Sequence, residues 1–237
     1  GHVRVARQGD AMTCSDLVED GIEPVSDIDL EDLAIFPLPQ CVLLPGGLLP
    51  LHVFEPRYRE LTRYCLDGNR PMGIARLLPA ARHQRDHAAV YQHLGVGRII
   101  CFEELEDGRF LLLLRGLTRV VIERELPQTH SFRHVTARRL TDQQTDPDAG
   151  VHLHQQLMAL CDRLATLLDK GGRQLRDLAR GPTPGACADA VAAALMMDAD
   201  ERQALLEQTD PNLRLRTALS QVSRLLCQVV PCDGVVN

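Results

Sequence analysis

The hydrophobic pattern of this 237-residue chain changes its period near residues 141–148, and this change constrains the fold more than any other feature. Before it, short apolar runs alternate with turns that contain Pro and Gly, a pattern typical of β-strands. After it, leucines recur every three or four residues, as they do on the buried face of a helix. The sequence therefore predicts an α+β protein, with strands in its first part and helices in its second.

Residues 33–145 are expected to hold seven short strands and one helix. Pro56 suits the first turn of a helix and Asp67-Gly68 suits its end. Asp107-Gly108 between two apolar runs indicates a β-hairpin, and Gly116 inside an apolar run indicates a bulge or a corner. These signals predict a small antiparallel barrel or sandwich, with strands near residues 33–37, 48–54, 72–78, 95–105, 111–114, 117–126 and 132–140.

Residues 1–32 carry scattered acidic side chains and show no stable hydrophobic period. A segment of this composition buries too little apolar surface to offset the entropy that ordering costs. We therefore expect an extended or disordered lead-in that ends where the strand pattern begins, at Leu33.

Residues 146–230 are expected to form a helical bundle. Lys170 followed by Gly171-Gly172 is a typical helix end, because a cation and then a glycine suit the carboxyl terminus. Asp198 and Glu201 have the spacing of a capping box. The first helix follows Asp146-Pro147, and further helices are expected to begin at Thr183-Pro184, Asp198 and Asp210-Pro211.

Enzyme chemistry is not predicted. Lys170 is the only lysine, and it is not part of a P-loop or placed for a Ser-Lys dyad. No Gly-x-Ser-x-Gly elbow occurs. The pairs His83/His87 and His130/His134 have metal-ligand spacing but stand in polar loops or strand edges, so they are interpreted as surface histidines. We predict no catalytic residue, no metal and no cofactor.

Charge and cysteine content limit the partners and the compartment. A net charge of −6 argues against a dedicated nucleic-acid binder, because neutralising phosphates dominates that affinity. The eight cysteines include no Cys-x-x-Cys pair, which favours a reducing compartment. Apolar runs fall short of the roughly 20 residues that span a bilayer. The cytoplasm is therefore expected, without a membrane partner.

The remaining candidates form an unusual polar and apolar set. Glu55 and Arg57 flank Pro56, and Arg115 and Arg119 flank Gly116. One interpretation is structural, with a carboxylate near a helix start and arginines that bridge strand ends. The other is the rim of an apolar binding groove, to which we assign Leu48, Phe54, Glu55, Arg57, Tyr58, Arg115 and Arg119.

Three stretches of the sequence resemble a known family. They are Phe36-Pro37-Leu38-Pro39, the run from Leu44-Pro45-Gly46-Gly47 through Leu51-His52-Val53-Phe54-Glu55-Pro56-Arg57-Tyr58, and Leu112-Leu113-Leu114-Arg115-Gly116-Leu117-Thr118-Arg119. They resemble the N-terminal substrate-binding domain of the ATP-dependent Lon protease. The resemblance continues through Asp200–Glu207 and Asp210-Pro211, and it covers about residues 33–228.

The resemblance implies a PUA-like β pseudo-barrel followed by a helical subdomain. It also implies binding of unfolded polypeptide segments or of a partner protein. Because the chain ends where the ATPase and peptidase of a Lon protease would begin, we expect a free-standing, non-enzymatic binding module. Two alternatives remain open. PUA-like barrels often bind RNA, although the acidic charge and the few aromatic residues argue against it, and a hydrolase could use an unrecognised site.

Overall fold

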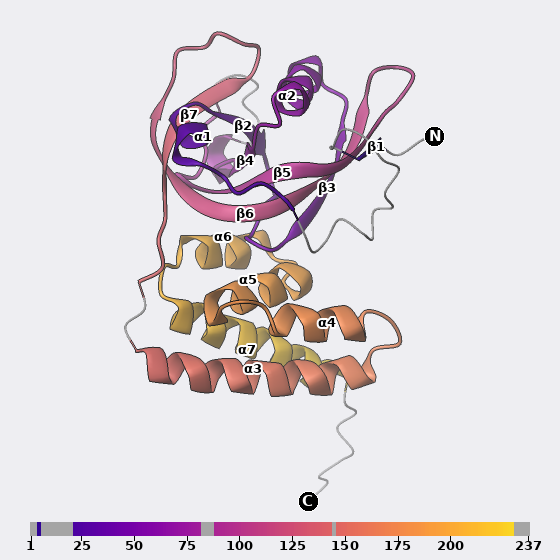
Figure 1. Ribbon diagram of the computed structural model, residues 1–237, viewed down its shortest axis with the longest axis vertical. Coiled ribbons are helices and arrows are strands. Elements are labelled where there is room, and N and C mark those ends of the chain that lie inside the picture. Colours follow the sequence, from indigo (N-terminus) through magenta and orange to yellow (C-terminus); the bar gives the residue numbers. More distant parts are fainter. Residues whose placement is uncertain (1–3, 6–20, 82–87, 144–145, 230–237) are drawn as a thin grey trace, which may run out of the picture. The chain divides into compact units, whose positions relative to one another are not determined.

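The computed structural model describes residues 4–5, 21–81, 88–143 and 146–229. Contacts divide the chain into two compact units, Gly1–Leu140 and Thr141–Asn237. The first unit is rich in strands and the second consists of helices (Figure 1). The expected α+β class is thus confirmed, and the division falls at the start of the range in which the hydrophobic period changes.

One seven-stranded sheet forms the first unit, in the order β1-β5-β4-β2-β7-β6-β3. Since β5 also pairs with β6, the strands β5, β4, β2, β7 and β6 close into a ring, which removes most open sheet edges. The barrel is antiparallel except between β2 and β4, a parallel pair that the sequence did not predict. The strands are β1 (Arg4–Val5), β2 (Leu33–Leu38), β3 (Leu48–Val53), β4 (Met72–Arg76), β5 (His93–Glu104), β6 (Phe110–Glu125) and β7 (Arg133–Arg139).

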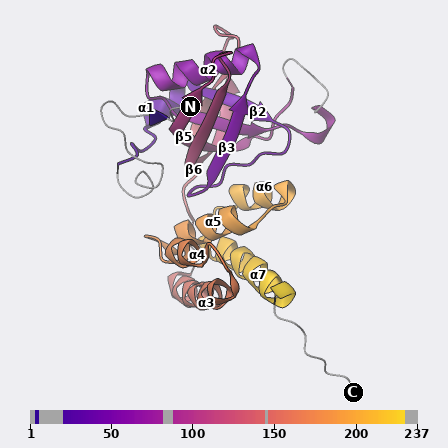
Figure 2. The ribbon, with the colours of Figure 1, turned by 90° about the vertical axis from the view of Figure 1, so that its right-hand side faces the viewer.

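Strand β6 is a single long strand where two separate strands were expected, so that expectation is wrong. Its first half pairs with β3 and its second half with β7, while β5 pairs with both halves. Figure 2 shows β6 between β5 and β3. At the middle, Gly116 exchanges backbone hydrogen bonds with Gly46 and Gly47 at 2.9 and 2.8 Å. A Cβ atom at Gly116 would lie 2.1 Å from the carbonyl oxygen of Leu44. Glycine is therefore required for this close approach. The pairing with β5 shifts its register beside Gly116, as in a β-bulge, and the strand continues.

The expectation of an extended or disordered lead-in is wrong for residues 27–31, which form a helix. Helix α1 (Asp27–Glu31) begins with a capping box in which Ser26 and Asp29 exchange hydrogen bonds. The buried Arg98 donates to the backbone oxygens of Glu23, Pro24 and Asn69 and to the Asp29 carboxylate. The acidic composition of the segment indicated disorder. It does not show that Arg98, about 70 residues further along the chain, holds the segment in place.

The barrel unit has two apolar cores, one on each side of β2. Leu33 and Ile35 face the first, inside the ring, and Ala34 and Phe36 face the second, which lies under helix α2 (Pro56–Asp67). Burial on both faces explains why β2 is apolar at successive positions and does not alternate. The helix begins at Pro56 and ends at Asp67, as predicted, and a short 3-10 helix, η1, follows β4 at Pro79–Ala81.

The second unit contains five helices in its described residues, one more than expected. They are α3 (Pro147–Leu167), α4 (Gly172–Ala179), α5 (Pro184–Leu195), α6 (Ala199–Glu207) and α7 (Pro211–Val229). Gly171 adopts φ of 84° between α3 and α4, so the Gly-Gly pair also starts a second helix. Leucines of α3 and α7 meet in one apolar core with residues of α4 and α5. Among the described helices, none has the length and apolar character to cross a membrane.

Candidate functional site

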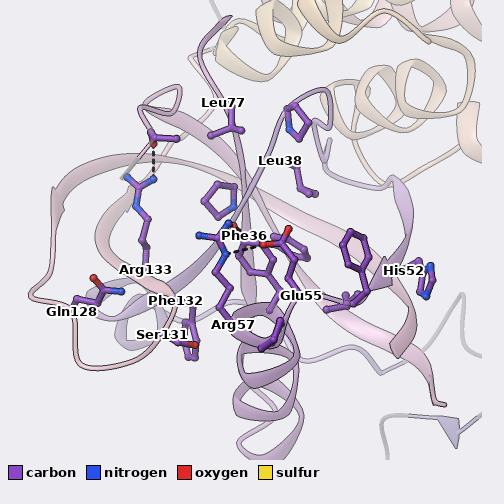
Figure 3. Close-up of a pocket in the computed structure, with 17 residues that line it drawn as sticks. Phe36, Leu38, His52, Glu55, Arg57, Leu77, Gln128, Ser131, Phe132 and Arg133 are labelled. Carbon is purple, nitrogen blue, oxygen red and sulfur yellow. Dashed lines mark hydrogen bonds and ion pairs between the residues drawn. The ribbon is translucent and has the colours of Figure 1, made fainter. Parts of the chain in front are cut away.

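A pocket of about 1160 Å³ opens in the barrel unit (Figure 3). It lies between the end of β2, the segment that connects β3 to α2, and the segment that leads into β7. Its lining residues are 36–39, 52–58, Leu77, Ala88, Gln128 and 131–133. Ligand sites for small molecules usually enclose about 300–1,000 Å³, so this pocket is large enough for several residues of a polypeptide.

One side of the pocket is formed by the junction of β3 and α2. Pro56 occupies the first turn of α2, and Glu55 precedes it without capping the helix through its side chain. The Glu55 carboxylate instead accepts from Nε and Nη2 of Arg57, at 3.1 and 3.0 Å, as Figure 3 shows. The neighbouring Phe54 leaves 61% of its surface exposed. An ion pair and an exposed aromatic ring thus stand together on the rim.

Aromatic rings form the buried part of the same side. The rings of Phe36 and Tyr58 lie 4.1 Å apart between centroids, and the Arg57 guanidinium carbon lies 4.6 Å from the Tyr58 ring. Burial raises the pKa of the Tyr58 hydroxyl, an effect that the charge of Arg57 partly opposes. Tyr58 therefore stays neutral at physiological pH and contributes an apolar surface.

The opposite side comes from the segment before β7 and from β7 itself. Arg133 makes two parallel hydrogen bonds to the Glu125 carboxylate, at 2.7 and 2.9 Å, and a third to the Ala88 carbonyl oxygen. The hydroxyl of Ser131 donates to Glu60 of α2 at 2.5 Å. This hydrogen bond is the main reason that the pKa of the Glu60 carboxyl is lowered. The segment is thereby tied to α2 as well as to the sheet.

Four of the seven predicted site residues line this pocket: Phe54, Glu55, Arg57 and Tyr58. The other three are not among its lining residues. Leu48 is exposed on β3 and pairs across the ladder with Arg115 of β6, whose pKa burial lowers. Arg119 is buried within the barrel unit.

Sequence reasoning missed the far side of the pocket. Gln128 and residues 131–133 stand 61 to 66 residues beyond the end of α2, and nothing in their local pattern marks a site. The pairing of β7 with β2 and the hydrogen bond of Ser131 to Glu60 of α2 bring them to the pocket. The Pro37 and Pro39 side was visible in the sequence as a proline-rich strand end, but it was not assigned to the site.

The histidines do not form a metal site in the described part of the chain, where no group of three or more His, Cys, Asp or Glu side chains could hold an ion. His130 and His134 stack at 5.1 Å between ring centroids. The prediction of a surface position is wrong for His134, which is buried with Nδ1 lying 2.6 Å from Asp32. Its Nε2 is buried and makes no hydrogen bond, so this Asp-His pair offers no exposed base to a substrate. His83 and His87 lie outside the described residues.

Two solved structures share the fold of a barrel followed by helices. One is a Lon N-terminal domain protein from Xanthomonas campestris, with 24% identity, a TM-score of 0.56 and coverage of 80% of this chain and 97% of that one. The other is the N-terminal domain of a Lon protease from the Mycobacterium avium complex, with 19% identity, a TM-score of 0.58 and coverage of 81% and 98%. These likenesses establish the fold and agree with the expected PUA-like barrel.

The sequence comparisons define the family. The profile of the ATP-dependent protease La (LON) substrate-binding domain matches residues 32–224, so the chain belongs to this family. Lon protease 2 of Myxococcus xanthus is 26% identical over 194 residues, and the Lon protease of Anaeromyxobacter dehalogenans is 25% identical over 194 residues. Each match covers 81% of this chain and 23% of the relative. The chain thus spans about a quarter of the length of these relatives.

Proposed function

We propose that the barrel unit binds apolar segments of unfolded polypeptides, or of a partner protein, in the pocket between β2, α2 and the segment before β7. The single observation that carries this proposal is the exposed Phe54 at the rim of a large pocket. Exposed apolar surface beside a pocket, edged by polar groups, is typical of an interaction site. Membership of a substrate-binding family supports the same assignment.

The electrostatics of the rim support a neutral occupant. Arg57 pairs with Glu55 and Arg133 pairs with Glu125, so each cation is balanced by a carboxylate. A pocket balanced in this way attracts neither a phosphate backbone nor a strongly acidic ligand. Binding then depends on apolar contact and requires no catalytic step.

The cytoplasm is the compartment that we propose for this activity. The cysteines of the described residues are free thiols, as is usual in reducing surroundings. They are Cys41, Cys65, Cys101, Cys161, Cys187 and Cys227. Unfolded segments of other proteins arise there during synthesis and after damage.

Fluorescence anisotropy with reduced, carboxymethylated α-lactalbumin, labelled with fluorescein, tests the proposal. We expect binding, and a loss of about tenfold in affinity for Phe54→Ala, because truncating an aromatic anchor costs about 1–2 kcal/mol. Ile28→Ala is the matched control, since Ile28 is 78% exposed in the same unit and does not line the pocket. Equal loss in both variants, or no binding at tens of micromolar, contradicts the proposal.

A further inference from the structure

Strand β2 has neighbours on both sides for only part of its length. Leu33–Ile35 pair with β7, and Ile35–Leu38 pair with β4. From Phe36 to Leu38, the side that faces away from β4 therefore has no strand partner among the described residues. The pocket lies along this stretch, because residues 36–39 line it.

The gap exists because the chain before β7 turns toward α2. If the register of β2 and β7 continued, Phe132 would stand opposite Phe36, and Ser131 opposite Pro37. Instead, Ser131 donates a hydrogen bond to Glu60, and the Phe132 ring packs 5.4 Å from the Tyr64 ring. Both contacts hold the segment against α2. No strand therefore pairs with this part of β2 among the described residues, and the pocket lies there.

One hydrogen bond fixes the direction of the backbone groups along this edge. The N–H of Leu77 donates to the carbonyl oxygen of Leu38 at 2.9 Å, so the polar backbone groups of Leu38 face the β4 side. Successive residues of a strand direct these groups to opposite sides. The carbonyl oxygen of Pro37 therefore faces away from β4, on the stretch of β2 that lines the pocket. Since proline has no N–H, this edge presents a hydrogen-bond acceptor without the donor that would normally accompany it.

We propose that the occupant of the pocket is an extended polypeptide strand that adds to β2 at Pro37. A backbone N–H of the occupant donates to the carbonyl oxygen of Pro37, and its apolar side chains contact Phe54 and Tyr58. This inference rests on the proposed function and specifies how the polypeptide is recognised. Recognition through the backbone makes affinity depend little on sequence, which suits a domain that binds many unfolded segments. Arg57 and Arg133 are already paired with carboxylates, so an uncharged backbone can bind beside them without leaving a charge unpaired.

A scan with N-methylated peptides tests this binding mode on the unaltered protein. The probe is the tightest-binding decapeptide from a tiled set covering α-lactalbumin, with each backbone amide methylated in turn. We expect at least one central methylation to weaken binding by about fivefold or more, since it removes one hydrogen bond. Methylation of the amides directly before and after it should change affinity less than twofold, because these point away from β2. Uniform tolerance, or equal loss at consecutive amides, overturns strand addition while leaving the proposed function intact.

A protein variant provides the complementary test. Pro37→Ala restores an N–H at the edge, which can donate to a carbonyl oxygen of the occupant. We expect the decapeptide to bind about fivefold more tightly, the equivalent of one added hydrogen bond. Pro184→Ala is the control, because it removes a proline from the start of α5 in the other unit. Unchanged or weaker binding by a Pro37→Ala protein with a native circular dichroism spectrum overturns the inference. Failure of every tiled peptide to bind the unaltered protein overturns it together with the proposed function.

Discussion

Arg98 of the barrel unit and Arg214 of the helical unit are both buried, and their charges are satisfied in opposite ways. Arg98 of the barrel donates mainly to backbone carbonyl oxygens, and among the described residues Asp29 is its carboxylate partner. Arg214 of the helical unit lies between two carboxylates, with two hydrogen bonds of 2.8 Å to Asp142 and an ion pair of 3.2 Å with Asp189. The barrel uses its arginine to hold a segment of backbone in place. The helical unit uses its arginine to neutralise a buried carboxylate.

Removing the arginine should therefore cost more in the helical unit. Arg214→Ala leaves the Asp189 side chain, which is 5% exposed, without its cation, and we expect a loss of about 3–5 kcal/mol in unfolding free energy. Urea unfolding followed by circular dichroism at 222 nm measures this loss. Arg224→Ala is the control, because its ion pair with Glu201 is exposed and should contribute less than about 1 kcal/mol. Similar losses of unfolding free energy in the two variants would contradict the expectation that the buried ion pair contributes more to stability than the exposed one.

The corresponding barrel variant, Arg98→Ala, should have a smaller effect on stability and a local effect on structure. We expect a loss of about 2 kcal/mol, because several carbonyl oxygens lose a charged donor. The segment from Glu23 to Glu31 should also become sensitive to a glutamate-specific protease. Arg138→Ala, which breaks only an exposed pair with Glu123, is the control and should leave cleavage unchanged. Resistance of the segment in Arg98→Ala would show that Arg98 does not hold it.

The reactivity of one buried thiol in each unit, Cys65 and Cys161, measures local unfolding of that unit. Burial raises the pKa of Cys65 in the barrel to about 12 and that of Cys161 in the helical unit also to about 12. At pH 8 only about one in ten thousand of each is a thiolate, so alkylation should be far slower than at the exposed Cys227. Site-resolved mass spectrometry should find Cys161 accelerated in Arg214→Ala and Cys65 accelerated in Arg98→Ala. Equal acceleration of both thiols in either variant would contradict this division.

The smallest expected effect is on pH dependence. The pKa of Glu60 is lowered in the folded protein, so the folded state favours the carboxylate form. The contribution of Glu60 to the free energy of unfolding is therefore fully present above the ordinary pKa of a carboxyl group, and it is lost as the pH falls through the lowered pKa. Protonation weakens the hold of Glu60 on Ser131 at one side of the pocket. Decapeptide affinity should therefore change by no more than about threefold between pH 5 and pH 3, because the group is exposed to solvent. Glu60→Gln should remove this dependence, and its persistence in that variant would assign it to another group.

The helical unit could be predicted from the sequence to within a few residues. Caps at Thr183 and Asp198 and prolines at the first helical positions are local signals, and the helices begin where they indicate. Helix α4 was not predicted. The Gly171-Gly172 pair fits the end of one helix as well as the start of the next, and the local sequence does not distinguish the two. Local chemistry therefore determines most of this unit.

The barrel and its pocket could be predicted only in part. The strand positions and the residues around Pro56 follow from local patterns, but the parallel pairing of β2 with β4 depends on partners that are distant in the sequence. The same holds for the segment near Ser131, whose place at the pocket is set by Glu60, 71 residues earlier. Helix α1 was missed for this reason, since the groups that hold it belong to β5 and β7.

The hold of Arg98 and Arg139 on residues 23–29 has a consequence for synthesis on the ribosome. Arg139 donates to the carbonyl oxygen of Val25 at 2.6 Å, from 114 residues further along the chain. At about 5–20 residues per second, the ribosome needs roughly 6–23 s to make that intervening chain. Residues 23–29 are therefore among the first of the described residues to be translated and among the last to find their partners. During that interval Val25 and Leu30, which the folded barrel buries in its core, have no partners and are open to chaperones.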